Sequence, residues 1–212
     1  MHRIPGTAWY GVVFMLAFLL LTGCAGRVTP PVVLHEPVDV YLVDHGRHSS
    51  LVLPRGQGLV RYAYGEWGWY VMGRRGTLAG MSAMLWPTRG ALGRRIFPDL
   101  AISPFPTWVA PEGVEEVFSL QAEAARVEQL QRELDRAFDA GSDQVHYHEG
   151  YDLEFVPYHR PYWLGHQSNL VTAQWLESLG FEVAGIPWLS NWHIETPTED
   201  PEPVGTSLSR PR

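Results

Sequence analysis

The sequence predicts an α+β fold in which a small and mostly antiparallel sheet packs with helices. Short β-branched and aromatic runs gather in the first half of the chain, and the clearest helical periodicity follows them. Strands that precede helices, instead of alternating with them, are typical of this class. A hydrophobic content of 45% is ample for a single core.

Three strands are expected near the start of the folded part, at residues 38–43, 49–53 and 59–64. The first is β-branched and aromatic with partial alternation, which is the pattern of a strand. Gly46 marks a break after it. Pro54 is expected to end the second strand, because proline cannot donate to a β-ladder.

The middle of the chain is expected to contain loops and short elements. Residues 65–76 are rich in Gly and Trp and predict a loop with a short strand inside. Residues 78–85 are small and apolar, which favours a short helix that stops before Pro87. Residues 98–111 predict another loop, and residues 114–120 a strand.

The clearest helix is expected in the middle of the chain, with Gly141 as its C-cap. Apolar residues recur there at helical spacing, at Ala124, Val127, Leu130, Leu134, Ala137 and Phe138. The spacing predicts one face that packs on the core and one that is solvated.

A second helix is expected over residues 170–179, where Gly180 ends it. Ser168 or Asn169 is placed to cap its N-terminus, because a side-chain oxygen there accepts from a free backbone N–H. Short strands are expected to follow at 181–183 and 192–194. The dense His, Tyr and acidic segment before this helix predicts a polar loop or the rim of a groove.

The N-terminus has the layout of an export signal that ends at the only cysteine. An apolar run at 12–21 precedes the motif Leu21-Thr22-Gly23-Cys24. The motif resembles the lipobox of bacterial lipoproteins, which implies cleavage before Cys24 and acyl chains on its sulfur and amino group. The competing interpretation is a transmembrane anchor, but the apolar stretch is shorter than the roughly 20 residues that a span needs.

The lipobox resemblance implies a signal peptide at 1–23. Composition predicts three further segments: a lipid-anchored tether at 24–37 that carries three prolines, a folded domain at 38–195, and a disordered tail at 196–212 that has four prolines and many polar residues. No acidic residue follows Cys24 directly. By resemblance to lipoprotein sorting in Gram-negative bacteria, the expected location is the cell envelope, at the periplasmic face of the outer membrane.

The charge balance argues against a nucleic acid partner. The formal net charge is −7, and all 16 basic residues are arginines. An acidic chain gains nothing from phosphate or from anionic lipid headgroups. The membrane is therefore an expected partner only through the lipid anchor, and no cofactor is predicted.

Two segments carry residues suited to chemistry, at 44–50 and at 166–169. The second lies at a predicted helix start, where free backbone N–H groups can stabilise an anionic nucleophile or an oxyanion. A histidine held by the sheet in the first segment could face that helix end as a general base.

These segments resemble those of the DUF2459-type, urease-region-associated bacterial lipoproteins. The resemblance covers roughly residues 38–195 and lies in four segments: Val40 to Leu53, Gly65 to Tyr70, Leu85-Trp86-Pro87-Thr88 and Tyr162 to Gly180. It implies an arrangement similar to a circularly permuted papain/NlpC-like fold. In that arrangement the histidine strand precedes the helix that the nucleophile opens.

The resemblance implies that His48 is the base and Ser168 the nucleophile, with Ser in place of the cysteine that family members often carry. Asn169 is then expected to cap the helix or orient a substrate, while His45 and Glu66 are weaker candidates for supporting roles. A serine is far less acidic than a thiol and needs a base acting in concert with it. The site is therefore either a hydrolase or acyltransferase acting on envelope amides or esters, or a catalytically silent binding site.

The aromatic content supports the second alternative. The chain holds 9 Trp and 9 Tyr, which either fill the core or line a groove for an envelope peptide or lipid. The candidate ligand-binding residues are Trp67, Trp69, Trp86 and His166. Under this alternative, substitutions of the tryptophans matter more than substitution of Ser168.

The histidine-rich stretch raises the question of a metal site. Candidate ligands are His146, His148, His159 and His166. No helical His-Glu-x-x-His motif and no cysteine pair accompanies them. No metal is predicted.

Overall fold

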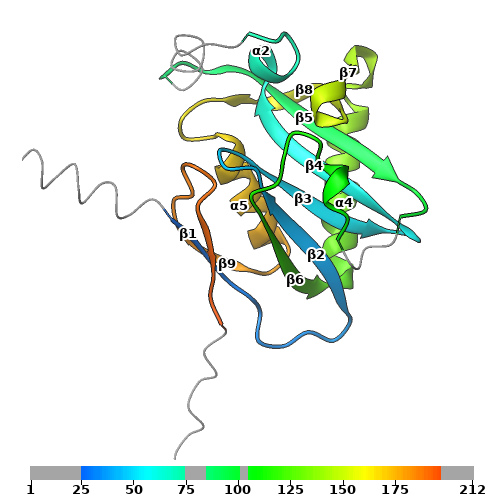
Figure 1. Ribbon diagram of the computed structural model, residues 1–212, viewed down its shortest axis with the longest axis vertical. Helices are drawn as coiled ribbons and strands as arrows, with labels where there is room; N and C mark the ends of the chain where they lie inside the picture. Colours follow the sequence, from blue (N-terminus) through cyan, green and yellow to red (C-terminus); the bar gives the residue numbers. More distant parts are fainter. Residues whose placement is uncertain (1–24, 75–84, 101–104, 197–212) are drawn as a thin grey trace, which may run out of the picture.

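The computed structural model describes residues 25–74, 85–100 and 105–196, and its α+β architecture confirms the predicted fold class (Figure 1). Its main element is a seven-stranded antiparallel sheet with the order β6-β2-β3-β4-β5-β8-β7. The strands are β2 (Pro37–Asp44), β3 (Ser49–Arg55), β4 (Gly58–Glu66), β5 (Thr88–Phe97), β6 (Glu116–Glu123), β7 (His146–His148) and β8 (Leu153–Tyr162).

A second sheet of three strands has the order β10-β1-β9. It consists of β1 (Gly26–Thr29), β9 (Glu182–Gly185) and β10 (Trp192–Ile194). Strand β1 runs antiparallel to β9 and parallel to β10. Val28 in this strand is fully buried in the main core, so residues 26–29 belong to the folded part.

The expected tether at 24–37 is therefore wrong for residues 26–29. Four residues are too few to show a β pattern, and the strand exists because β9 and β10 supply its partners from the other end of the chain. Gly26 suits the position, because a Cβ there would lie 2.8 Å from Pro187 Cβ. The segment 1–23 and the tail from 197 lie outside the described residues.

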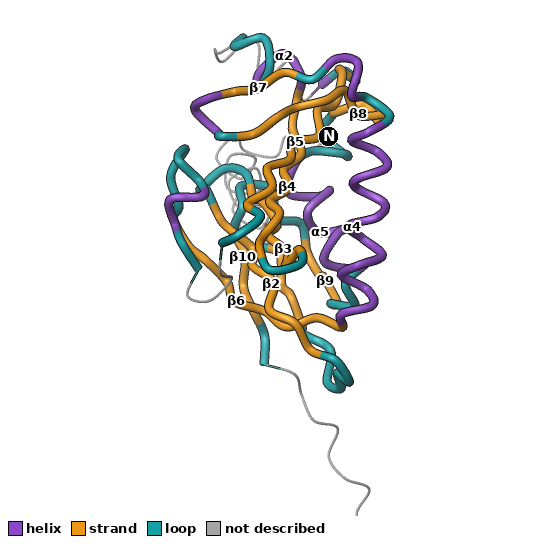
Figure 2. The backbone as a smooth tube through the Cα atoms, turned by 90° about the vertical axis from the view of Figure 1, so that its right-hand side faces the viewer, coloured by secondary structure: helices purple, strands orange, loops and turns teal. Residues whose placement is uncertain are grey.

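Two helices cover one face of the large sheet, α4 (Ala124–Asp139) and α5 (Ser168–Ser178) (Figure 2). A four-residue helix, α2 (Trp67–Tyr70), follows β4 at the end of the sheet. Single 3₁₀ turns occur at 107–109, 142–144 and 149–151. Among the described residues, no helix combines the length and apolarity that a membrane crossing requires.

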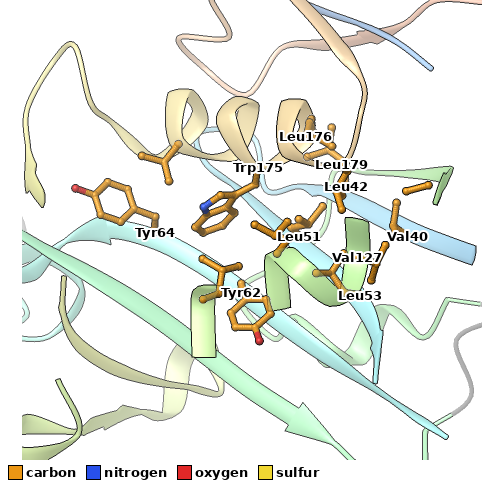
Figure 3. Close-up of a cluster of buried hydrophobic side chains, with 14 of the residues drawn as sticks. Val40, Leu42, Leu51, Leu53, Tyr62, Tyr64, Val127, Trp175, Leu176 and Leu179 are labelled. Atoms are coloured by element: carbon orange, nitrogen blue, oxygen red, sulfur yellow. The ribbon is translucent and has the colours of Figure 1, made fainter. Parts of the chain in front are cut away.

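The main core lies between the sheet and the two helices. Alternate residues of β4, Val60, Tyr62 and Tyr64, face the helices together with Leu51 and Leu53 of β3. In Figure 3, Trp175 and Leu176 of α5, and Leu179 directly after it, lie over these strands. Each fully buried side chain of this size contributes about 1.5–3 kcal/mol, so this layer holds α5 firmly on the sheet.

Most expected elements in the first half are confirmed, and the differences have local causes. Strand β3 continues through Pro54, whose missing N–H does not prevent pairing with Leu59 across the ladder. In the expected loop at 65–76, residues 65 and 66 end β4, and helix α2 follows instead of a short strand in the described part up to residue 74. The helix begins there because the carboxylate of Glu66 accepts a hydrogen bond of 2.6 Å from the N–H of Trp69. The expected helix at 78–85 lies almost wholly outside the described residues.

Besides β1, three strands were not expected: β5, β7 and β8. Strand β5 is rich in arginine and glycine, which are poor strand formers. Its Arg94 reaches Asp135 of α4 at 2.8 Å, and this tertiary contact satisfies the charge. The segment before α5 is not a polar loop, because β7 and β8 occupy most of it and Leu153, Phe155 and Val156 of β8 are buried.

The helix ends differ from expectation in their caps. Gln167 is the N-cap of α5, and its Oε1 accepts from the N–H of Asn169 at 2.8 Å. Gly180 adopts φ +98° after this helix, as expected for a glycine that ends a helix in the left-handed region. Helix α4 ends at Asp139 with Ala140 as its cap, so Gly141 is not the C-cap.

Candidate functional site

A cavity of about 580 Å³ lies at one end of the large sheet. Strands β2, β4 and β8 end there, β3 and β5 begin there, and the N-terminus of α5 closes one side. Its aromatic wall consists of Trp69, Tyr70, Tyr151 and Tyr162. Its polar lining includes His45, Arg47, His48, Glu66, Glu115 and Ser168.

Ser168 lines this cavity as the first residue of α5. Only 5% of the residue is exposed, and its hydroxyl donates to Gln167 Oε1 at 3.3 Å. The first N–H groups of an α-helix have no partner inside the helix, and the helix dipole places partial positive charge there. The position therefore favours an oxygen that becomes negative.

His48 lines the same cavity and faces a carboxylate that the sequence did not indicate. Its Nε2 lies 3.6 Å from Oε1 of Glu112, an ion-pair distance somewhat longer than a direct hydrogen bond. The His48 ring stacks on His45, with centroids 4.6 Å apart, and meets the edges of Tyr70 and Tyr151. These contacts fix the plane of the imidazole.

Glu112 is held by Arg61, a fully buried arginine in the middle of β4. The guanidinium contacts the Glu112 carboxylate and also donates to Val109 O at 3.0 Å and to Tyr151 O at 3.1 Å. Burial alone would raise the pKa of Glu112, but His48 and the Arg61 charge outweigh it and hold the pKa at about 2. Glu112 is therefore an anion at neutral pH.

His45 packs against His48 and bonds to the groups around Glu112 and Arg61, and it is unsuited to act as a base. Its Nδ1–H donates to Gly113 O at 2.5 Å, and its Nε2 accepts from the hydroxyl of Ser50 at 2.9 Å. Ser50 Oγ in turn accepts from Arg61 Nε at 3.0 Å. Burial, followed by the Arg61 charge, lowers the pKa of His45 to about 3, so the ring stays neutral.

The same residues form the group best placed to hold a metal among the described residues. Ligand atoms of His45, His48 and Glu112 all lie within 4.8 Å of one another. The chemistry of the set fits a cation poorly, because the His45 lone pair already accepts a hydrogen bond and Arg61 supplies the positive charge that Glu112 requires. The geometry favours a Glu112 carboxylate that is held by Arg61 and orients the His48 ring. His146, His148 and His159 do not line the cavity.

Asn169 and Glu66 do not have the roles expected of them. Asn169 is fully buried, accepts from the Ser49 hydroxyl at 3.1 Å and donates to Arg47 O at 3.1 Å, so it connects α5 to the residues on both sides of His48. Glu66 lines the cavity, but its carboxylate caps α2. The acid that faces His48 is Glu112.

Of the four expected ligand-binding residues, only Trp69 lines the cavity. Trp67 lies 4.7 Å from the Arg89 guanidinium, and Trp86 is 71% exposed elsewhere. His166 is buried, where its Nδ1 lies 3.1 Å from the Tyr64 hydroxyl and 2.9 Å from Pro161 O. The cavity instead uses tyrosines from α2, from the 3₁₀ turn at 149–151 and from β8.

Three residues that matter at the site were missed by sequence reasoning. Arg61 carried a usable signal, since a lone charge inside an apolar strand requires a buried partner. Glu112 carried none, because it lies in a loop of ordinary composition. Gln167 precedes Ser168, and its Nε2 is buried without a hydrogen-bond partner.

Comparisons of the chain with protein-family models, with curated proteins and with solved structures find no match.

Proposed function

We propose that the chain is a serine hydrolase or acyltransferase that acts on amides or esters of the bacterial cell envelope. The observation that carries this proposal is that Ser168 and His48 line one cavity, with Glu112 behind the imidazole. Nucleophile, base and orienting acid are the three parts that serine-based acyl transfer requires. The resemblance to permuted papain/NlpC-like proteins assigns the same two residues.

The proposed reaction begins with proton transfer from the Ser168 hydroxyl to His48. Because Nε2 of His48 faces Glu112, Nδ1 is the nitrogen that accepts this proton. Ser168 Oγ then forms a bond to the substrate carbonyl carbon, and the imidazolium returns its proton to the departing amine or alcohol. Water completes hydrolysis by the same route, whereas a second amine or alcohol gives acyl transfer.

Oxyanion stabilisation is proposed to come from two sources at the start of α5. The first is the set of N–H groups at the helix N-terminus. The second is Gln167 Nε2, which belongs to a side chain that is 2% exposed. The orientation of this amide is defined, because its Oε1 accepts from both Asn169 N and Ser168 Oγ.

Attachment to the envelope is proposed to occur through acylated Cys24, at the periplasmic face of the outer membrane. The lipobox-like motif supports this location. The aromatic wall of the cavity favours a substrate group with an apolar or sugar-like face, because such rings stack on tyrosine and tryptophan.

The test is labelling of the purified mature protein with a fluorophosphonate, which reacts with activated serines. The proposal expects labelling of the wild type and its loss in both Ser168→Ala and His48→Ala. Ser178→Ala is the matched control, because it removes an exposed serine from the last residue of the same helix. Labelling that persists in Ser168→Ala, or that never occurs in the folded wild type, would contradict the proposal.

A second candidate is a catalytically silent site that binds an envelope ligand or partner. The observation that favours it is that the Ser168 hydroxyl donates to Gln167 and not to His48. Under this alternative Trp69→Ala weakens ligand capture while Ser168→Ala does not. Turnover that depends on both Ser168 and His48 would remove this candidate.

A further inference from the structure

The loop between β9 and β10 is a feature, separate from the cavity, that points to contact with a membrane. It covers residues 186–191, which the two strands hold beside the start of β1. Gly26 pairs with Gly185 on one side and with Trp192 on the other, and its N–H donates to Asn191 O at 2.8 Å. Gly26 is thus enclosed by this loop.

The chain leaves the described part at this point. Only Ala25 separates Gly26 from Cys24, and consecutive Cα atoms are 3.8 Å apart, so the Cα of Cys24 lies within about 8 Å of the Cα of Gly26. A lipid carried by Cys24 therefore starts next to the loop. Because β1 is a strand and not a tether, no flexible linker separates the folded domain from the lipid anchor.

The composition of the loop fits a membrane surface. Its sequence, Ile-Pro-Trp-Leu-Ser-Asn, has no charged residue. Ile186 is 41% exposed and Leu189 is 69% exposed, and half-buried Trp188 lies between them. Exposed aliphatic side chains with a tryptophan are the combination that favours the interface between headgroups and acyl chains.

The loop is also fixed with respect to the cavity. Ser190 is buried with φ +61°, an uncommon conformation for a residue other than glycine. Its hydroxyl donates to His48 O at 3.1 Å and lies 2.5 Å from Ser49 Oγ. Because these bonds join the loop to His48 and to the first residue of β3, the exposed tip of the loop has a defined direction relative to the site.

We propose that Ile186, Trp188 and Leu189 enter the interfacial region of the bilayer that anchors Cys24. The lipid and the loop then form two contacts with the same membrane, which restrain the domain more than a lipid alone. The proposal goes beyond the proposed hydrolase chemistry and rests only on acylation of Cys24. It places His48, which Ser190 of the loop contacts, on the membrane side of the domain, so the substrates within reach are those at or near the membrane surface.

The test uses the fact that Cys24 is the only cysteine, so that acylation leaves no other thiol in the mature chain. Leu189→Cys in the full lipoprotein is labelled with an environment-sensitive fluorophore. The acylated protein is then reconstituted in vesicles of phosphatidylethanolamine and phosphatidylglycerol containing a lipid with a shallow nitroxide quencher. Mass spectrometry checks that Cys24 carries its acyl groups.

The matched control is Val145→Cys, another exposed aliphatic position, at 45% exposure. It precedes β7, which lies far from the three-stranded sheet in both Figure 1 and Figure 2. We expect several-fold stronger quenching of the label at Leu189 than at Val145, and the same result for Ile186→Cys. Equal quenching at both positions, no quenching at either, or a chain that lacks acyl groups on Cys24 would overturn the proposal.

Discussion

The two faces of the seven-stranded sheet are built by different physical rules. The face under α4 and α5 is apolar, with Val60 and Tyr62 of β4 packed among leucines. The opposite face, which we call the polar face, holds two smaller apolar clusters, but between them the same strands carry Ser50 and Arg61, which are fully buried and bonded to His45 and Glu112. Apolar burial is not directional, whereas the polar cluster requires every partner to be in place. The proposed base, His48, contacts this cluster through Glu112.

The largest effect is expected from breaking the polar cluster. Arg61→Met leaves the Glu112 carboxylate buried without its counter-charge, which typically costs about 3–5 kcal/mol in the free energy of unfolding. Chemical denaturation measures the loss. The double variant Arg61→Met with Glu112→Gln is expected to regain most of it, because no unpaired charge is left. A single variant as stable as the wild type would contradict this account of the cluster.

A somewhat smaller loss of stability is expected from a substitution on the apolar face. Leu176 is fully buried against the sheet, so Leu176→Ala should lower the free energy of unfolding by about 2–5 kcal/mol, through lost burial and a cavity. No second substitution on the polar face should restore it. Coupling between Leu176→Ala and Glu112→Gln in a double-mutant cycle would show that the two faces are not independent.

Acid sensitivity should come from the polar face. The pKa of His45 is about 3 in the fold and 6.5 ordinarily, so between these values the unfolded chain binds the extra proton. Stability therefore falls as the pH drops from 6.5 toward 3, with a slope of up to about 1.4 kcal/mol per pH unit. The pKa of Glu112 is about 2 in the fold and 4.5 ordinarily, so protonation of this carboxylate also lowers the stability as the pH drops below 4.5. Denaturation across this range should give a shallower slope for His45→Gln, and an unchanged slope would count against a neutral buried His45.

The smallest effect is expected from the exposed aromatics. Trp86 is 71% exposed and does not line the cavity, so Trp86→Ala should change the free energy of unfolding by no more than about 0.5 kcal/mol. Fluorophosphonate labelling of Ser168 should also be unchanged. Loss of labelling in this variant would indicate that the cavity extends farther than its described lining.

The sequence predicted the apolar face well because periodicity encodes it. The apolar spacing of α4 and the β-branched and aromatic run of β2 are local patterns, and the helix and the strand that they predict are confirmed. The sequence also brought His48 and Ser168 together, through a resemblance. It could not supply β1 or β5, because pairing partners distant in the sequence determine them.

The polar face was beyond sequence reasoning for the same physical reason. Glu112 is 64 positions from His48, in a loop whose path depends on the whole fold. Glu66 was the nearer acid in sequence, yet it caps α2. An acid that orients a base is identified by distance and burial, and neither quantity is written in the residue types alone.

The most direct test compares these two acids. The rate constant for fluorophosphonate labelling of Ser168 is measured in Glu112→Gln and in Glu66→Gln, with the thermal midpoint of each variant checked beside the wild type. Because the proposed mechanism requires an oriented imidazole to activate the serine, it predicts that Glu112→Gln slows labelling on the order of 10²-fold or more, while Glu66→Gln stays near the wild-type rate. Folded Glu112→Gln protein that labels as fast as the wild type, or a larger loss in Glu66→Gln, would contradict it.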